Sequence, residues 1–198
     1  MGTRDRLVDT AMQMLAEQGY GSTSVADLLR RAGVNAGSLY HFFPTKQALL
    51  MAVLERYRDG LYPMLIDPAW HEEPDPIERI FALLARYRWM ILETECSYGC
   101  PIGSLALELH DADPAVRELL AVNFAGWVGA IERCLADAGE RLPADLDRRA
   151  LAEFVLTTME GGVMQARTHR NVGHFDRGVA MLRDHFAMLF ARAEREHA

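Results

Sequence analysis

The chain has 198 residues and a formal net charge of −7, with hydrophobic residues making up 50% and charged residues 25% of it. This length allows one or two domains with a substantial core. The three cysteines, Cys96, Cys100 and Cys134, lack the paired spacing of zinc ligands, which excludes a cysteine-pair zinc site and fits an environment where thiols stay reduced. With no apolar signal segment and no run expected to span a membrane, we expect a cytoplasmic protein without a membrane partner.

The negative charge lies outside the N-terminal part of the chain. Residues 1–60 contain seven Lys and Arg and six Asp and Glu, a net charge of +1, whereas the remaining residues contain 14 and 22, a net charge of −8. Because local charge distribution decides whether a surface can bind a polyanion, the overall charge does not exclude nucleic acid as a partner.

The first two predicted elements are helices. An amphipathic helix is expected from Arg4 to Gln18, and it ends at Gly19. A second helix is expected to start after Ser24, which can cap it with Asp27 as a weak capping-box partner. Gly33 ends this helix, and the turn from Gly33 to Ala36 has the length and glycine content of a helix-turn-helix corner.

The third predicted helix, from Gly37 to Phe42, is barely longer than one turn. A helix this short is unstable by itself in water, so tertiary contacts must hold it. Leu39 and Phe43, spaced i, i+4, can face the core, which leaves Ser38, Tyr40 and His41 pointing outward. These hydrogen-bonding side chains lie where a recognition helix meets the major groove.

These residues carry a family resemblance. The segment from Arg4 to about Tyr57 closely resembles the DNA-binding domain of the tetracycline-repressor (TetR) family of transcriptional regulators. The matching positions follow in order over about forty residues, which is far more specific than one helix-turn-helix pattern. They are Gly19-Tyr20, Thr23-Ser24, Ala32-Gly33-Val34, Gly37-Ser38-Leu39-Tyr40, Phe43, Lys46 and Leu49. Two further stretches, Cys100 to Glu108 and Met159 to Gly162, are similar to the lincomycin-resistance-regulator-like branch of the family.

The resemblance implies a homodimeric transcriptional regulator that binds operator DNA and a small-molecule effector. It implies a helix-turn-helix DNA-binding domain over residues 1–50 and a ligand-binding and dimerisation domain over residues 51–198. By resemblance and side-chain chemistry, Ala36, Gly37 and Tyr40 are expected at base edges. The residues expected mainly at phosphates are Ser24, Asn35, Ser38, His41 and Lys46, the only lysine of the chain.

The rest of the chain also has helical patterns. Helices are expected from Thr45 to about Leu61, from about Asp75 to Cys96, from Pro101 through Leu109, from Pro114 to Gly139, from Ala144 to His169 and from about Asp176 to Ala193. Four prolines between Tyr62 and Pro76 predict an irregular boundary loop. With no strand pattern or internal repeat, the fold class is all-α, a three-helix head followed by a C-terminal helical bundle.

The last two predicted helices are the candidate dimer interface. Val179, Leu182, Phe186 and Leu189 are spaced 3, 4 and 3 as in a coiled coil, and Gly161-Gly162 would allow close approach of another helix. A four-helix bundle across a two-fold axis would use both features. The alternative is that the seam faces the core of its own chain and the glycines form a kink.

The effector site is predicted from polar residues that interrupt apolar helix faces, because buried polar groups need partners. Asn123, Thr158 and Gln165 interrupt such faces. Adaptable apolar walls and one carboxylate for a cationic group complete the candidates, which are Trp89, Met90, Phe124, Trp127, Met159 and Glu93. The set predicts a largely apolar effector. For each residue the alternative is an ordinary packed or internally satisfied side chain.

Other functions are weaker interpretations. Cys96 and Cys100 lack a basic neighbour that would lower a thiol pKa, and His169, His174 and Asp176 lack a third ligand at a recurring spacing, so we expect neither a redox switch nor a metal site. The sequence contains no nucleophile elbow, phosphate loop or acid pair, so we expect no enzyme and no cofactor. A ligand-independent DNA-binding or architectural protein remains the alternative function.

Overall fold

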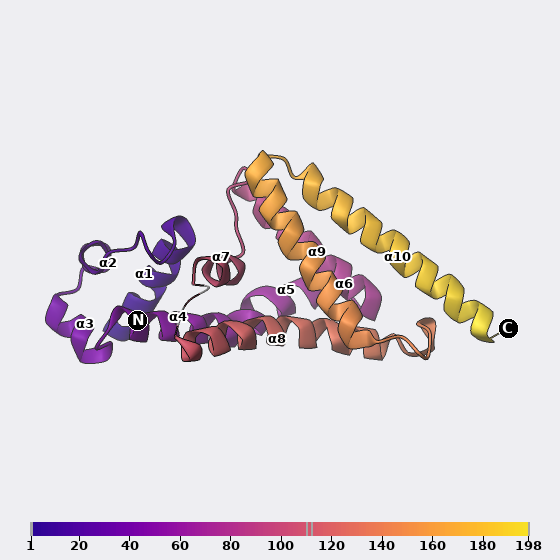
Figure 1. Cartoon of the computed structure of the whole chain (residues 1–198), viewed down its shortest axis with the longest axis horizontal. Helices are drawn as coiled ribbons and strands as arrows, with labels where there is room; N and C mark the ends of the chain where they lie inside the picture. The colour runs from indigo at the N-terminus through magenta and orange to yellow at the C-terminus, as the bar shows by residue number, and fades with distance from the viewer. Residues whose placement is uncertain (1, 110, 112, 198) are drawn as a thin grey trace. The chain divides into compact units, whose positions relative to one another are not determined.

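The computed structural model describes residues 2–109, 111 and 113–197. Within these residues the chain is helical and contains no strand, which confirms the predicted all-α class (Figure 1). The first four helices are α1 (Thr3–Gln18), α2 (Val25–Ala32), α3 (Ala36–Phe42) and α4 (Lys46–Gly60). Their bounds agree with the predicted ones to within a residue or two, because glycines and side-chain caps mark the helix ends locally.

The segment after α4 differs from the prediction. Instead of an irregular loop, residues Leu61–Ile66 form a π-helical stretch, η1, and Asp67–Trp70 form a short helix, α5. Proline lacks an N–H and its ring clashes with the carbonyl four residues back, so a wider turn lets the helical path continue past Pro63. Pro68 lies in the first turn of α5, where a missing N–H costs nothing.

The next helices begin at capping residues or prolines, and the last two begin at Arg148 and Gly173 instead of the predicted Ala144 and Asp176. Asp75 caps α6 (Pro76–Glu93) by accepting hydrogen bonds from the N–H groups of Ile77 and Glu78 at 2.8 and 3.1 Å. Helix α7 (Pro101–Glu108) starts with a proline. Helix α9 (Arg148–His169) is capped by Asp147, and α10 (Gly173–His197) follows a left-handed residue, Arg170.

Helix α8 (Pro114–Asp137) is the most apolar long helix. Among the described residues it is the one helix long and apolar enough to cross a membrane, with a mean hydropathy of 1.3 over its most apolar window. This qualifies the sequence-based expectation that no run could span one. The core helix of a soluble protein passes the same test, and 44% of the window is buried inside the molecule.

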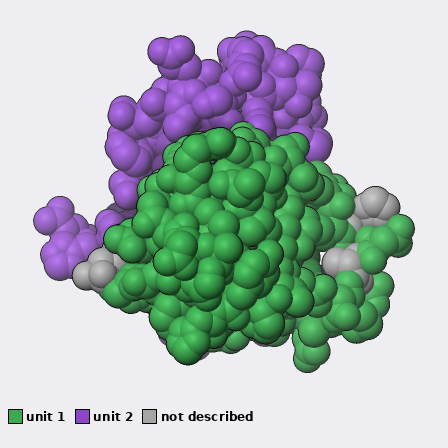
Figure 2. Space-filling view, turned by 90° about the vertical axis from the view of Figure 1, so that its left-hand side faces the viewer, with its two compact units in different colours: residues 1–60, 100–124 green, residues 61–99, 125–198 purple. Residues whose placement is uncertain are grey.

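The contacts divide the chain into two compact units (Figure 2). Unit 1 consists of Met1–Gly60 and Cys100–Phe124, and unit 2 consists of Leu61–Gly99 and Ala125–Ala198. The division differs from the functional boundary expected after residue 50, which stays a prediction. Helix α4 packs on α1 along its length, and Leu105 of α7 and Val116 of α8 are buried in the core of unit 1.

The core of unit 2 contains the seam that the sequence analysis assigned to a dimer interface. Leu182 and Phe186 are each 1% exposed in the isolated chain, and the Phe186 ring meets the Phe81 ring edge-on at a centroid distance of 5.5 Å. Leu189 is buried and Val179 is partly buried in the same cluster. These side chains are covered by their own chain, so the alternative interpretation, an intramolecular seam, describes them.

Gly162 also serves an intramolecular contact. A Cβ atom at this position would lie 2.9 Å from Cδ2 of Phe175 and 3.3 Å from its Cα. The missing side chain therefore lets the start of α10 pack against α9, and these two helices share the most extensive contact between elements in the described residues. At Gly161 the same atom would have nothing within 4 Å, so that position is open.

Candidate nucleic-acid interface

Helix α2 is held at both ends by the residues that the sequence singled out. The Ser24 hydroxyl accepts from the Asp27 N–H at 3.0 Å and donates to the Asp27 carboxylate at 2.6 Å. This hydrogen bond is the main reason why the pKa of Asp27 lies below its usual value. Gly33 adopts the left-handed conformation with φ 62°, and the Val34 N–H donates to the Leu29 carbonyl at 3.1 Å. The corner between α2 and α3 is therefore fixed by caps and by one glycine.

Helix α3 is a short helix held by two apolar anchors. Leu39 and Phe43 are buried in the core of unit 1, as predicted. The Asn35 side-chain oxygen caps the helix by accepting from the Ser38 N–H at 2.8 Å. The cap and the two anchors supply the tertiary support that a helix of this length needs.

The outward face of α3 is polar and accessible. Ala36, Gly37 and His41 are exposed, and Tyr40 is 53% exposed. Ser38 is only partly buried. All predicted base-edge residues therefore lie on accessible positions of one helix, whereas the side-chain oxygens of Ser24 and Asn35 are already engaged as caps. Their first role is to position α2 and α3.

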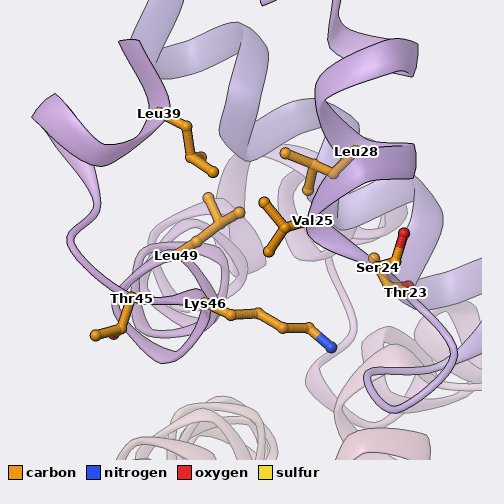
Figure 3. Close-up of a pocket in the computed structure, with 8 residues that line it drawn as sticks. All are labelled: Thr23, Ser24, Val25, Leu28, Leu39, Thr45, Lys46 and Leu49. Carbon is orange, nitrogen blue, oxygen red and sulfur yellow. The ribbon is translucent and has the colours of Figure 1, made fainter. Parts of the chain in front are cut away.

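Lys46 is bound within unit 1. Its Nζ donates to the Tyr20 carbonyl at 2.5 Å and lies 4.0 Å from the centroid of the Tyr20 ring. Partial burial lowers the pKa of Lys46, and the charge of Glu108 opposes that shift. Figure 3 shows the side chain extended, with its ammonium group on the side where Thr23 and Ser24 lie. The predicted contact with phosphate would require this ammonium group to change partners.

The gap beside Lys46 is too small for an effector. It is lined by residues of α2, α3 and α4 and has a volume of about 10 Å³ (Figure 3). A volume of this size holds about one water molecule. This gap therefore does not hold an organic effector.

The structure adds one cation that the sequence analysis did not select. The Arg4 guanidinium lies 5.4 Å from the centroid of the Phe43 ring, next to the end of α3, and Arg4 is exposed. Four other arginines of unit 1, Arg30, Arg31, Arg56 and Arg58, form ion pairs with carboxylates. The sequence analysis could not select Arg4, because it lies far from α3 in the sequence and no local pattern links the two.

Two of the predicted effector residues belong to unit 1. Asn123 is buried, but its side-chain amide donates to the Leu54 carbonyl at 3.1 Å and to the Leu119 carbonyl at 2.9 Å. One bond joins α8 to α4 and the other lies within α8, so the side-chain amide is engaged as in the internally satisfied alternative. Phe124 is partly buried.

The other predicted effector residues belong to unit 2 and do not share one environment. Trp127 and Met159 lie in its core, and the Trp127 Nε1 atom is buried without a hydrogen-bond partner among the described residues. Met90 and Thr158 are partly buried. Trp89 is 48% exposed with the Arg86 guanidinium over its ring, and Glu93 and Gln165 are exposed. Of these candidates, Trp127 and Met159 are the two that are buried in an apolar core.

The residues considered for a metal site or a redox switch are paired or buried. The rings of His169 and His174 stack with centroids 4.2 Å apart, and Asp176 forms an ion pair with Arg88 at 2.7 Å. Cys96 and Cys100 are both buried. Burial raises the pKa of the third cysteine, Cys134, to about 11.

A family model described as "Bacterial regulatory proteins, tetR family" matches residues 7–53, and a second, "Tetracyclin repressor-like, C-terminal domain", matches residues 76–182. The second match alone spans more than half of the chain. The chain belongs to the TetR family. Its two family models cover α1–α4 and the C-terminal helices, so the resemblance found in the sequence is confirmed.

The relatives are regulators of transcription, and the similarity spans most of the length of each one. The HTH-type transcriptional repressor DhaR of Mycobacterium sp. (strain GP1) is 29% identical over 170 residues, covering 85% of this chain and 84% of that protein. The HTH-type transcriptional regulator LmrA of Bacillus subtilis (strain 168) is 26% identical over 171 residues, covering 85% and 88%. The crystal structure of regulatory protein TetR from Rhodobacter sphaeroides has a TM-score of 0.80 and 25% identity, covering 90% and 95%.

Membership of the TetR family decides the class of protein. Its members are helix-turn-helix transcriptional regulators, which are not enzymes, and dimers with small-molecule effectors are typical of them. LmrA among the relatives supports the narrower resemblance stated above. As a DNA-binding regulator of this family, the protein works inside the cell.

Proposed function

We propose that this TetR-family protein is a repressor in the cytoplasm that binds a near-palindromic operator as a homodimer and leaves it when a small, largely apolar effector binds. The observation that carries the proposal is the accessible polar face of α3, a helix of seven residues anchored by Leu39 and Phe43. A helix that contributes so little to its own core serves mainly by what it exposes.

Within this proposal, Ala36, Gly37 and Tyr40 contact base edges. The phosphates are contacted by Ser24, Asn35, Ser38, His41 and Lys46, to which we add Arg4. Support for the base contacts is the exposure of the three residues on α3. Small residues at positions 36 and 37 let the helix approach the bases, and the Tyr40 hydroxyl can donate or accept a hydrogen bond in the groove.

Selection of sequences from a random duplex pool tests the proposed operator binding. The full-length protein should enrich a near-palindrome whose half-site centres lie about 34 Å apart or a small multiple of that distance, because two recognition helices must enter major grooves on one side of the duplex. If repeated rounds enrich no common sequence at moderate salt, the protein is not a sequence-specific repressor.

The proposed homodimer uses the outer face of α9 and α10 in place of the buried seam. Large apolar side chains are exposed there, Met181 at 68% and Met188 at 63%, together with Phe154 and Met164. The Phe154 ring meets His185 of α10 edge-on at 5.9 Å, which places side chains of both helices on one surface. Gly161 of α9 is open and allows close approach of a partner helix. An exposed apolar face of this kind is typical of an interface.

The proposed effector contacts Trp127 and Met159 in unit 2. In the part of the chain that the structure describes, the buried Trp127 Nε1 donor lacks a hydrogen-bond partner, and a buried unsatisfied donor costs about 1–3 kcal/mol. A ligand with an acceptor atom would supply the missing partner. Asn123 is less suited, because both of its N–H groups already donate to backbone carbonyls.

Mass spectrometry of the protein purified under native conditions tests the effector proposal. We expect a co-purified apolar compound, and adding it should release a fluorescent operator duplex from wild-type protein but require a higher concentration with Trp127→Phe, which removes the donor and retains an aromatic ring. Release at equal concentrations from both proteins would remove Trp127 from the site. If no compound shifts either the melting temperature or operator affinity, the ligand-independent DNA-binding function is favoured.

A further inference from the structure

The turn between α1 and α2 is bound by a carboxylate from α7. Glu108, the last residue of α7, accepts from the Tyr20 N–H at 2.8 Å and from the Gly21 N–H at 2.5 Å. Both bonds join residues that lie almost ninety positions apart in the sequence, and both lie within unit 1. Charge-assisted hydrogen bonds of this kind are stronger than neutral ones.

Two glycines provide the space for this carboxylate. A Cβ atom at Gly19 would lie 2.7 Å from Glu108 Oε2, and one at Gly21 would lie 3.0 Å from Glu108 Oε1. Gly19 also has φ 81°, a conformation that other residues rarely adopt. The turn is therefore shaped to receive the Glu108 side chain.

One peptide group of this turn connects Glu108 with Lys46. The Gly21 N–H donates to Glu108, and the Tyr20 carbonyl, on the opposite side of the same peptide bond, accepts from Lys46 Nζ at 2.5 Å. Because a trans peptide is planar, its N–H and C=O point in opposite directions and one orientation satisfies both partners. The Thr23 N–H also donates to the Tyr20 carbonyl, at 3.2 Å, so the carboxylate and this turn bond together hold the carbonyl in the orientation that binds the ammonium group.

The turn has other bonds that hold it without Glu108. The Thr23 hydroxyl donates to the Gly19 carbonyl at 2.7 Å, and the Gln18 side-chain amide donates to the Ser22 carbonyl at 3.1 Å. Loss of the carboxylate should consequently loosen the Tyr20–Gly21 peptide, whose carbonyl would keep its bond from the Thr23 N–H, and leave α1 and α2 folded.

We propose that Glu108 is a positioning residue that lowers DNA affinity by holding Lys46 on the Tyr20 carbonyl and away from phosphate. The inference rests on the proposed DNA binding. In the structure Lys46 has its internal partners, and a phosphate must compete with them. Helix α7, through Glu108, then sets how readily the only lysine of the chain is available to DNA.

The test is fluorescence anisotropy of the full-length protein with a 5′-labelled duplex of arbitrary sequence at low salt. Phosphate contacts dominate such binding, so no operator is needed. Glu108→Gln should bind about fivefold more tightly than wild type, the effect of gaining about one exposed ion pair. The plot of log affinity against log salt should steepen by about one for each head that engages the duplex.

Three further variants separate this mechanism from a general charge effect. Glu118→Gln removes an exposed carboxylate from α8 in the same unit and should leave affinity and salt slope nearly unchanged. Gly21→Ala retains every charge but places a methyl group against the carboxylate, so it should shift binding in the same direction as Glu108→Gln. In a Lys46→Met background, Glu108→Gln should have no effect, because the residue that it releases is absent.

The outcomes are distinct. Equal or weaker binding by folded Glu108→Gln, or the same gain with and without Lys46, overturns the inference and leaves the proposed function intact. If Glu108→Gln does not fold, Gly21→Ala decides in the same way. If wild-type protein does not bind duplex DNA at any salt concentration, the proposed function is wrong and the inference fails with it.

Discussion

Helix α3 and helix α10 each have one face that packs in a core and one that is exposed, and the two exposed faces differ in chemistry. Helix α3 exposes Tyr40 and His41, whereas α10 exposes Met181 and Met188. Hydrogen-bonding side chains on a short helix suit a hydrated groove with polar base edges. Thioether side chains on a helix of 25 residues suit a dry apolar surface. The comparison supports the proposal of one surface for DNA and another for a second copy of the chain.

The inner faces of these helices differ as well. Helix α3 needs two anchors, Leu39 and Phe43, and α10 contributes a longer row that includes Leu182 and Phe186. The row on α10 has the spacing of a coiled coil, yet it is covered within unit 2. An apolar row by itself thus identifies a buried face, and only the three-dimensional structure identifies what buries it.

The largest expected effect is on the core of unit 2. Phe186→Ala should lower the free energy of unfolding by about 3–5 kcal/mol, because it leaves a cavity among fully buried side chains. Denaturant unfolding measures the loss, and Asp184→Ala on the exposed side of α10 is the control, with a change within about 0.5 kcal/mol. If Phe186→Ala abolishes the dimer without lowering the free energy of unfolding, this seam is the dimer interface.

The next effect concerns the outer face of α10. Met188→Glu should weaken dimerisation by about 3 kcal/mol or more, because an unpaired charge would be buried at the interface. Light scattering over a concentration series measures the monomer–dimer equilibrium. Met64→Glu, at another exposed methionine of unit 2, should leave it unchanged. Equal dimerisation of both variants would exclude this face of α10.

A smaller effect is expected at the DNA surface. Tyr40→Ala should cost about 1–3 kcal/mol of operator affinity and reduce discrimination at one base position, while its low-salt binding to unrelated duplexes stays the same. Tyr40→Phe removes the hydroxyl and keeps the ring, so it distinguishes the contribution of the hydroxyl from that of the ring. Anisotropy with the selected operator and with single-base variants measures both. A uniform loss on all duplexes would mean that Tyr40 contacts the backbone.

The smallest effect is at the cap of α3. Asn35→Ala should reduce the stability of unit 1 by about 1 kcal/mol through loss of the bond to the Ser38 N–H, whereas Asn35→Asp retains an acceptor and should cost a few tenths. Hydrogen exchange at the amides of α3 measures local opening. If Asn35→Ala lowers operator affinity without faster exchange, Asn35 contacts DNA directly.

The head could be predicted from the sequence because its determinants are local. The caps Ser24 and Asn35, the corner glycine Gly33 and the anchors Leu39 and Phe43 all act within a few residues of the elements they define. The bond between Glu108 and the Tyr20–Gly21 turn could not be predicted, because nothing local in either segment identifies the other.

The C-terminal helices show where pattern analysis fails. Helix α10 has two apolar faces, one with Leu182 and Phe186 and one with Met181 and Met188, and the periodicity of the first made it the candidate interface. Asn123 interrupted an apolar stripe as a ligand contact would, but backbone carbonyls of α4 and α8 satisfy it. In both cases a distant part of the same chain supplies a contact that the local sequence does not reveal, for Asn123 the Leu54 carbonyl.

A hydroxyl-radical footprint on the selected operator tests both surfaces together. The wild-type dimer should protect two half-sites whose centres lie about 34 Å apart, or a small multiple of that distance, on one side of the duplex. At the same protein concentration Met188→Glu, which retains an intact α3, should protect neither half-site. Protection of a single half-site by the wild type, or an unchanged footprint with Met188→Glu, would contradict the account of one surface for DNA and another for the second copy.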